Sequence, residues 1–286
     1  MEGFIFHFFY YCKKIMGREI LKLKNINKTF FEEEDFEVLK DVSLTAKDGE
    51  FVCILGPSGC GKTILLYLIA GFLEPTSGEI TLNDRVIKKP GTDRMMVFQD
   101  YILFPWKTVY ENVLFGLYHS KIDEDQKKEI VMNHLELVGL TKFKDWYIHK
   151  LSGGMQQRVS IARALVVNPE ILLMDEPFSA IDSQYRKFLR ESIEKIWLQK
   201  KKTIIFVTHS ITEALKLADK IYVMSARPAK VQQVFEINMP RPRDKNSKEF
   251  INLAKDLNNL VSKEFASMML DKSTEKSLGE LLEGNF

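Results

Sequence analysis

Hydrophobic and polar residues follow two periodicities along this chain of 286 residues. Short runs of apolar, often branched residues have the length of β-strands, and longer segments between them carry apolar residues at helical spacing. We expect strands at 38–46, 50–55, 79–82, 95–98, 171–174, 203–207, 221–224 and 231–237. We expect helices at 64–70, within 108–138, and at 159–167, 185–197, 211–218 and 250–268. Strands that alternate with helices predict parallel βαβ units and an α/β fold.

Both ends of the chain depart from this pattern. Residues 1–15 are rich in aromatic residues, and two explanations stay open: the biological chain begins at Met16, or these residues form a tail that packs loosely or contacts a partner. Near the other end, Pro-Arg-Pro-Arg at 240–243 is a breaker cluster and a plausible boundary. The helix expected after it either packs on the body or makes a regulatory contact, and we favour packing. The division is an extension over 1–17, a main domain over 18–240 and a helical extension over 241–286.

Composition and charge narrow the class of protein. The 41 Lys and Arg residues against 39 Asp and Glu leave a net charge of +2, which gives no bulk attraction for nucleic acid. No stretch approaches the roughly 18–20 apolar residues of a membrane-spanning helix, and the aromatic start lacks the features of a secretory signal. The 3 cysteines are odd in number and lack metal-ligand spacing, which favours a reducing compartment. We expect a cytosolic protein.

A glycine-rich loop follows the apolar strand expected at 50–55. It fits the phosphate-loop pattern G-x-x-x-x-G-K-[ST], in which glycines let backbone amides curl around phosphates and the next helix offers its N-terminal amides. The lysine of such a loop reaches the β- and γ-phosphates, and the Ser or Thr hydroxyl binds Mg²⁺. The loop residues are Gly56, Pro57, Ser58, Gly59, Cys60, Gly61, Lys62 and Thr63. The sequence therefore predicts a nucleoside triphosphate site.

Two further segments carry chemistry that suits a phosphate-loop enzyme. Asp175 and Glu176 end the apolar strand at 171–174, and alternation along a strand sends their side chains different ways. The first carboxylate supports Mg²⁺ through water, and the second faces the γ-phosphate and the attacking water. Ser152 is a good helix N-cap followed by two glycines, which makes a second anion-binding helix start. Two such helix starts with one Lys62 suggest sites that are completed between two chains.

Four motifs in this order resemble an ABC transporter ATP-binding subunit. They are GPSGCGKT at 56–63, LSGGMQQR at 151–158, ILLMDEP at 171–177 and VTH at 207–209. The resemblance covers about residues 18–240. It implies a P-loop NTPase core of the ABC ATPase type, with an antiparallel β part and an inserted helical subdomain at about 100–167.

The resemblance also implies roles for single residues. Glu176, His209 and Gln99 would be catalytic, and Thr63, Gln99 and Asp175 would hold Mg²⁺. Phe30 would stack on adenine, and Ile64 would follow the loop near the α-phosphate. The signature residues would bind the ATP of the other subunit in a head-to-tail homodimer, or in a dimer with a close paralogue. These residues are Ser152, Gly153, Gly154 and Gln156, and Asp182 would lie at the dimer contact.

Four positions depart from the family pattern. Ile64 stands where Thr or Ser is usual, which removes one side-chain hydrogen bond worth on the order of 1 kcal/mol. Met155 replaces Gln, Ile181 replaces Leu, and Ser210 stands where Asp is common. None removes a catalytic group, so we expect a working ATPase.

A smaller set of motifs resembles the nitrate, sulfonate and taurine importer group. It comprises Phe-Pro-Trp at 104–106, Thr-Val-Tyr-Glu-Asn-Val at 108–113 and Ser-Ala-Arg-Pro-Ala-Lys at 225–230, with Pro-Arg-Pro-Arg at 240–243 further on. We expect an ATP-hydrolysing importer subunit bound peripherally at the cytoplasmic face of the membrane. It would work with a separate transmembrane permease and, indirectly, with an extracytoplasmic solute-binding protein. Phe104 and Trp106 near Gln99 would form the groove that receives a permease helix. The alternative is a soluble ABC ATPase that acts on nucleic acid or ribosomes.

Overall fold

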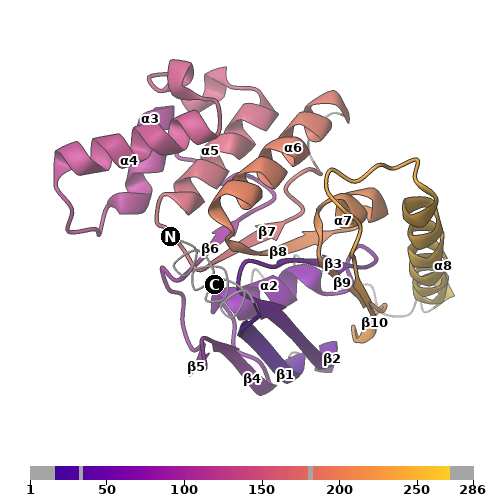
Figure 1. Ribbon diagram of the computed structural model, residues 1–286. Helices are drawn as coiled ribbons and strands as arrows, with labels where there is room; N and C mark the ends of the chain where they lie inside the picture. Colours follow the sequence, from indigo (N-terminus) through magenta and orange to yellow (C-terminus); the bar gives the residue numbers. More distant parts are fainter. Residues whose placement is uncertain (1–16, 32–34, 180–182, 271–286) are drawn as a thin grey trace, which may run out of the picture. The chain divides into compact units, whose positions relative to one another are not determined.

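The computed structural model describes residues 17–31, 35–179 and 183–270 (Figure 1). The open question about residues 1–15 concerns a segment outside these ranges. The chain divides into two compact units. One, the split unit, combines the segments up to Lys89 with those from Val207 onward, and the other, the middle unit, comprises Pro90–Phe206.

The split unit contains an antiparallel sheet. Its order is β2-β1-β4-β5, with Leu23 of β1 opposite Leu44 of β2 and Ile80 of β4. These three side chains are buried, because alternation along each strand directs a row of apolar residues to one face. The strands are β1 (Glu19–Phe31), β2 (Asp35–Lys47), β4 (Ser77–Leu82) and β5 (Arg85–Val86). This sheet is the antiparallel part that the family resemblance implies.

A second group of strands in the split unit leads to the phosphate loop. β3 (Phe51–Leu55) runs parallel to β9 (Lys220–Met224), which pairs antiparallel with β10 (Val231–Glu236). Every residue of β3 and β9 is buried, as a nearly continuous apolar run predicts. Within the described part of this unit, the helices are α2 (Lys62–Ala70), α7 (Ile211–Leu217) and α8 (Lys248–Leu270).

The middle unit places helices around a short parallel strand pair. β6 (Arg94–Val97) pairs in parallel with β7 (Ile171–Asp175), and β8 (Thr203–Thr208) crosses from the middle unit into the split unit along the chain. The helices are α3 (Val109–Leu114), α4 (Glu124–Leu137), α5 (Gly153–Leu165) and α6 (Ser183–Lys200). Short 3-10 turns lie at Phe115–Leu117, Thr141–Phe143 and Ile148–Lys150.

The helical pattern over 108–138 corresponds to two helices and a turn. Gly116 lies in the turn after α3, at a close approach to the end of α5. A Cβ atom at Gly116 would come within 2.5 Å of Val166 Cγ1 and 2.8 Å of the Arg163 carbonyl oxygen. The close passage needs glycine here, and periodicity alone could not reveal it.

The C-terminal segment is anchored to the split unit by two arginines. The buried Arg243 guanidinium donates to the backbone carbonyls of Leu215 and Ala218, and Arg241 donates to Leu217 and to Asp219. Backbone carbonyls and one carboxylate thus satisfy both cations. α8 then packs against α7. Of the helices in the described ranges, none is long and apolar enough to cross a membrane.

Candidate nucleotide-binding site

The phosphate loop connects the buried strand β3 to the helix α2. Gly61, the N-cap of α2, has φ 114°, a left-handed conformation that favours glycine. A Cβ atom there would meet Val38 Cγ1 of β2 at 2.8 Å, so the close approach to β2 is a second reason why this position requires glycine. No side-chain hydrogen bond caps α2, so the backbone amides of its first turn are not engaged by a capping side chain.

Lys62 is the cation of this loop, and only 4% of its surface is exposed. Its ammonium donates to the carbonyl oxygens of Gly56 at 3.0 Å and Pro57 at 2.7 Å. Because these carbonyls turn toward Lys62, the loop wraps around its own cation. A buried ammonium at a helix N-terminus is a strong attractor for phosphate oxygens.

Two buried thiols lie in and before this loop. Burial raises the pKa of Cys60, a member of the loop, and raises that of Cys53 in β3 well above its ordinary value. For Cys60 the nearby Lys62 ammonium acts in the opposite direction. Both residues therefore stay thiols at neutral pH, and neither has the exposed thiolate that redox chemistry needs.

The aromatic residue predicted to stack on adenine lies at the end of β1. Phe30 is only 4% exposed, and the Lys28 ammonium lies 4.8 Å from the centre of its ring. Phe30 pairs across the strands with Phe36 of β2, so both side chains emerge on the same face of the sheet. The half-buried Phe36 thus belongs to the same aromatic edge, a pairing that the sequence pattern did not single out.

His209 follows the carboxyl end of β8 and is exposed. The residues on either side hold it in place: Thr208 donates to the Glu213 carboxylate at 2.6 Å, and the Ser210 amide donates to Thr208 Oγ1 at 3.0 Å. Ser210 also caps α7 by accepting a hydrogen bond from the Glu213 amide. Serine therefore supplies the cap at a position where the family commonly has Asp.

In the middle unit, β7 ends on the predicted acidic pair. Asp175 is 5% exposed, whereas Glu176 is half-buried. Glu176 has φ 40°, a left-handed conformation that is uncommon for a non-glycine residue and is concentrated at functional sites. The Ser179 amide and hydroxyl both donate to the Glu176 carbonyl oxygen, at 3.1 and 3.0 Å, and fix this turn.

The signature loop opens the helix α5. Ser152 is the N-cap, and its hydroxyl accepts a hydrogen bond from the Met155 amide at 3.4 Å. The Gln156 side chain donates to the carbonyls of Ile148 and Leu151, which ties the preceding turn to the helix. Gln156 therefore braces its own loop, in addition to the role toward ATP that the resemblance implies.

The loop after Gln99 is held against the signature helix. Gln99 is exposed, and the residues that follow it, Tyr101 and Ile102, have φ 58° and 42°. Arg163 of α5 donates to the carbonyls of both these residues. A Cβ atom at Gly153 would lie 3.0 Å from the Tyr101 hydroxyl, so Tyr101 reaches the signature loop. Sequence analysis did not single out Tyr101 or Arg163, because these contacts join residues far apart in the chain.

Comparisons with known proteins agree with these motifs. Residues 39–179 match the family model described as ABC transporter. An uncharacterized ABC transporter ATP-binding protein of Methanocaldococcus jannaschii is 46% identical over 245 residues, which are 85% of this chain and 92% of that protein. This chain belongs to the ABC transporter ATP-binding proteins. It is therefore an ATP-binding ABC ATPase.

Other members of the family are similar over most of their length. The bicarbonate transport ATP-binding protein CmpD of Synechococcus elongatus is 44% identical over 229 residues, covering 79% of this chain and 82% of CmpD. The nitrate import ATP-binding protein NrtD of the same species is 42% identical over 226 residues, covering 78% and 82%. These matches place the ABC ATPase among transport proteins.

A solved structure supports the fold. An ATP-binding cassette, determined as a dimer in a post-hydrolysis state with ADP and phosphate, matches with a TM-score of 0.67 and 33% identity. The match covers 77% of this chain and all of that cassette. The expected P-loop core of the ABC ATPase type is thereby confirmed.

The predicted site residues of this ABC ATPase fall in both units. The split unit carries Phe30, the loop 56–64 and His209, and the middle unit carries Gln99, the signature residues, Asp175 and Glu176. Each of the segments 56–63, 175–176 and 209 lies at or just after the carboxyl end of a strand, where α/β folds bind ligands. Asp182 lies outside the described residues.

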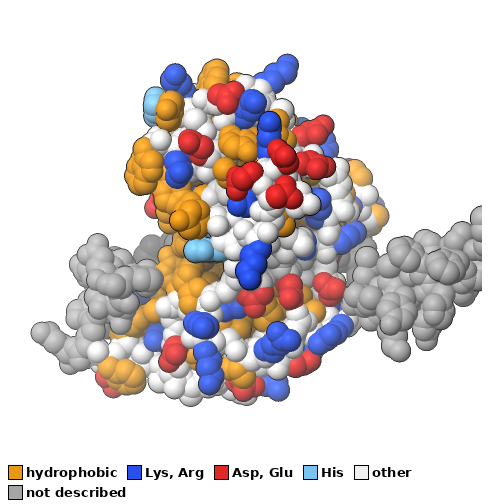
Figure 2. All heavy atoms as spheres, turned by 90° about the vertical axis from the view of Figure 1, so that its left-hand side faces the viewer, with side chains coloured by type: hydrophobic (Ala, Val, Ile, Leu, Met, Phe, Trp, Pro, Cys, Tyr) orange, Lys and Arg blue, Asp and Glu red, His pale blue; other side chains and the backbone are white. Residues whose placement is uncertain are grey.

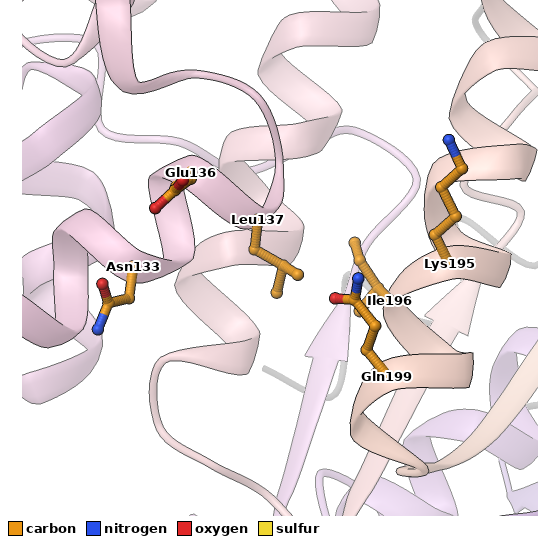
Figure 3. Close-up of a pocket in the computed structure, with 6 residues that line it drawn as sticks. All are labelled: Asn133, Glu136, Leu137, Lys195, Ile196 and Gln199. Atoms are coloured by element: carbon orange, nitrogen blue, oxygen red, sulfur yellow. The ribbon is translucent and has the colours of Figure 1, made fainter.

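A separate cavity in the middle unit contains none of these residues. It has a volume of about 390 Å³ and lies between α4 and α6. Asn133 and Glu136 line it from α4, and Lys195 and Gln199 line it from α6 (Figure 3). Its open, mixed polar lining has no cluster of groups that suits phosphate.

Proposed function

We propose that this ABC ATPase energises the uptake of a small anionic solute through a separate transmembrane permease. The observation that carries the proposal is the complete set of ATPase motifs in a chain whose relatives include bicarbonate and nitrate transport ATP-binding proteins. Bicarbonate and nitrate are both small oxyanions. The motifs of this chain also resemble those of sulfonate and taurine importers. The subunit would bind the permease at the cytoplasmic face of the membrane, with an extracytoplasmic protein that delivers the solute.

ATP hydrolysis assigns a task to each group. Lys62 and the amides of the phosphate loop bind the β- and γ-phosphates, and Glu176 takes a proton from the attacking water. His209 and Gln99 contact the γ-phosphate and the water. Ser152, Gly153 and Gly154 bind the γ-phosphate of ATP held by a second subunit of a head-to-tail dimer, with Asp182 at the contact. Each assignment rests on position in a motif and, for every residue except Asp182, on the local geometry described above.

The donor chemistry of three residues suits Mg²⁺. Thr63 supplies a hydroxyl, Asp175 a buried carboxylate and Gln99 an amide oxygen, all hard oxygen ligands. Within the described residues no cluster of three or more His, Cys, Asp or Glu side chains forms a dedicated metal cage. This agrees with an ion that relies on substrate phosphates for much of its coordination. When bound, Mg²⁺ would neutralise charge that develops on the phosphates.

An aromatic patch of the middle unit is the proposed contact with the permease. Trp106 is 70% exposed, and its ring lies 5.6 Å from that of Phe104, which packs edge-on to Phe115 at 4.7 Å. The buried Asn112 accepts from the Phe104 amide and donates to the Phe104 carbonyl, so the loop that presents Trp106 is fixed. Exposed hydrophobic side chains of this unit are visible in Figure 2. Large exposed aromatics on a rigid support are typical anchors of a protein interface.

Co-expression with a permease whose gene lies beside that of this subunit tests the function. We expect the permease to co-purify with the subunit and Glu176→Gln to trap an ATP-bound dimer, with hydrolysis reduced by about 10²-fold or more. Glu136→Gln, an equivalent change at an exposed position of α4, is the matched control. Near-normal hydrolysis by Glu176→Gln would show that Glu176 is not the general base. Co-purification with nucleic acid or ribosomes in place of a permease would favour the alternative function.

A second variant tests the contact with the permease. Trp106→Ala removes an exposed ring and leaves the ATP site intact, so we expect transport to be lost while ATP binding stays unchanged. Transport can be measured in vesicles that contain the permease, with uptake of labelled oxyanions as the readout. Leu198→Ala, which removes an exposed hydrophobic side chain of α6 in the same unit, is the control. Unchanged transport by Trp106→Ala would refute the docking surface.

A further inference from the structure

The segment 225–230, which follows β9, contacts the phosphate loop through Arg227. The Arg227 guanidinium donates through Nε to the carbonyl oxygen of Gly59 and lies 5.1 Å from the centre of the Phe36 ring. A Cβ atom at Gly59, where φ is 76°, would meet Arg227 Nη2 at 3.1 Å. Arg227 therefore spans from the phosphate loop to the aromatic edge of β2, and all these groups belong to the split unit.

The contact with Gly59 affects the amide that follows it. In a planar trans peptide the carbonyl and the next N–H point in opposite directions. When Arg227 holds the Gly59 carbonyl, the Cys60 N–H turns to the other side, where it lies 3.4 Å from the Pro57 carbonyl oxygen. Phosphate loops bind anions through backbone amides, so the orientation of each peptide plane in the loop matters for binding. Arg227 thus holds one peptide plane of the loop from outside, while Lys62 holds two carbonyls from within.

The segment that carries Arg227 is itself fixed on both sides. The Ala229 amide donates to the Val38 carbonyl at 2.8 Å, and the Lys40 amide donates to the Ala229 carbonyl at 3.0 Å, which joins the segment to β2. On the other side, the Ala226 amide donates to the Glu264 carboxylate of α8 at 3.0 Å. Ala226 precedes Arg227 directly. The C-terminal helix therefore bonds to the backbone next to the residue that contacts the phosphate loop.

We propose that Arg227 is a positioning residue for the phosphate loop, and that α8 sets its position through the hydrogen bond from Ala226 to Glu264. The C-terminal helix thereby controls the affinity of this ABC ATPase for nucleotide. This inference rests on the proposed role of the loop 56–63 in binding the phosphates. It assigns to α8 the regulatory contact that the sequence left open, and it requires no ligand beyond ATP itself.

Binding measurements with the full chain test the role of Arg227. Arg227→Gln removes the charge and the Nε donor, and we expect the Kd for MgATP to rise about tenfold, as for loss of a charged hydrogen bond. Inorganic tripolyphosphate should lose affinity by the same factor, because it binds the same loop without a base. KM should rise while kcat at saturating ATP stays unchanged, and Arg227→Lys, which retains a charged donor, should recover part of the affinity.

Several outcomes would overturn the role of Arg227. Loss of ATP binding with unchanged tripolyphosphate binding would show that Arg227 acts on the adenine base of ATP and not on the phosphate loop. A fall in kcat with unchanged KM would indicate a general structural defect. Lys62→Ala separates this inference from the proposed site: if that variant binds ATP normally, the site fails. If Lys62→Ala abolishes binding and Arg227→Gln does not weaken it, only the positioning role fails.

A double-mutant cycle tests the link to α8. Glu264→Ala removes the acceptor for Ala226 and should raise the Kd for MgATP by about three- to fivefold, within the usual range of coupling energies. Glu264→Gln keeps an acceptor oxygen and should stay close to the wild type. Combining Glu264→Ala with Arg227→Gln should raise the Kd no further than Arg227→Gln alone, because both changes act through one contact. Glu249→Ala, an exposed position on the same helix, is the control.

Two results would sink the link between α8 and the loop. One is a rise in the Kd of the double variant equal to the product of the factors seen in the two single variants, because the free-energy effects of independent sites add. The other is an unchanged Kd in Glu264→Ala while the variant retains the wild-type helical content by circular dichroism. In that case α8 serves packing alone.

Discussion

Two helices of this ABC ATPase begin at glycine-rich loops, and their starts are built differently. α2 has a glycine N-cap without a side-chain hydrogen bond, and the adjacent Lys62 is buried. α5 has Ser152 as N-cap, its hydroxyl bonds to the Met155 amide, and Ser152 is exposed. The start of α2 thus has its own cation and uncapped amides, whereas that of α5 is capped and open to solvent.

We propose that this difference lets the start of α2 bind phosphate alone, whereas the start of α5 needs a second surface. A buried cation together with uncapped amides forms a strong anion site within one chain. A capped helix start attracts anions through its dipole, which is worth only 0.3–1 kcal/mol at an exposed position. We therefore expect the α5 start to contribute to binding only when another chain brings the phosphate to it. The dimeric cassette with ADP and phosphate is a related protein in which two copies associate.

The largest expected effect concerns the start of α2. Lys62→Ala removes the buried ammonium and its hydrogen bonds, so we expect ATP affinity to fall by roughly 10²-fold or more, measured by calorimetry. Lys24→Ala, which removes an exposed lysine of β1, should leave the affinity unchanged. If both variants bound ATP with the same affinity, the Lys62 ammonium would not contribute specifically to ATP binding.

The second effect separates the two helix starts. Ser152→Arg places a bulky cation where a phosphate from another chain would bind, and we expect hydrolysis to fall by about 10²-fold, as for loss of preorganised donors. ATP binding by the single chain should change less than twofold, because α2 is untouched. The assays are steady-state phosphate release and calorimetry. Asn133→Arg, which adds the same charge at an exposed position of α4, is the control. A parallel loss of ATP binding would contradict the division of roles.

The contrast between the two starts was predictable in part from sequence. The strand before the loop, the glycines and Lys62 follow one another in the chain, so a local pattern reveals them. The same holds for the apolar strand β7 and the acidic pair that ends it. These predictions succeed because local sequence determines strand, turn and helix start together.

The supporting contacts were not predictable, because they join residues that are distant in the chain. Arg227 reaches Gly59, Glu264 reaches Ala226, and Tyr101 lies against Gly153. Each depends on how the strands and helices pack. The spacing of apolar residues likewise could not predict the turn at Gly116, because this turn depends on the close approach of the chain to the end of α5. Such contacts appear only when tertiary packing is known.

The third prediction concerns a pH response of the middle unit. Burial lowers the pKa of His134 on α4 below its ordinary value of 6.5, although its ring bonds to the Ile130 carbonyl. The unfolded chain therefore binds a proton more readily than the folded chain, so stability present above pH 6.5 falls as the pH drops below that value. Thermal unfolding between pH 7.5 and 5.5 should show a smaller decrease in Tm for His134→Asn. His119→Asn is the control, and an equal decrease in both variants would contradict the assignment.

The smallest effect distinguishes capping from anion binding at α5. Ser152→Ala removes the cap and should lower the free energy of unfolding by about 1 kcal/mol, measured by denaturant titration. Ser152→Asp retains a capping oxygen and adds a negative charge that favours the helix N-terminus, so its stability should match or exceed the wild type. The same charge repels phosphate, and hydrolysis should therefore fall in the stable Asp variant. If Ser152→Asp were stable and fully active, the start of α5 would be a structural cap that does not contact phosphate.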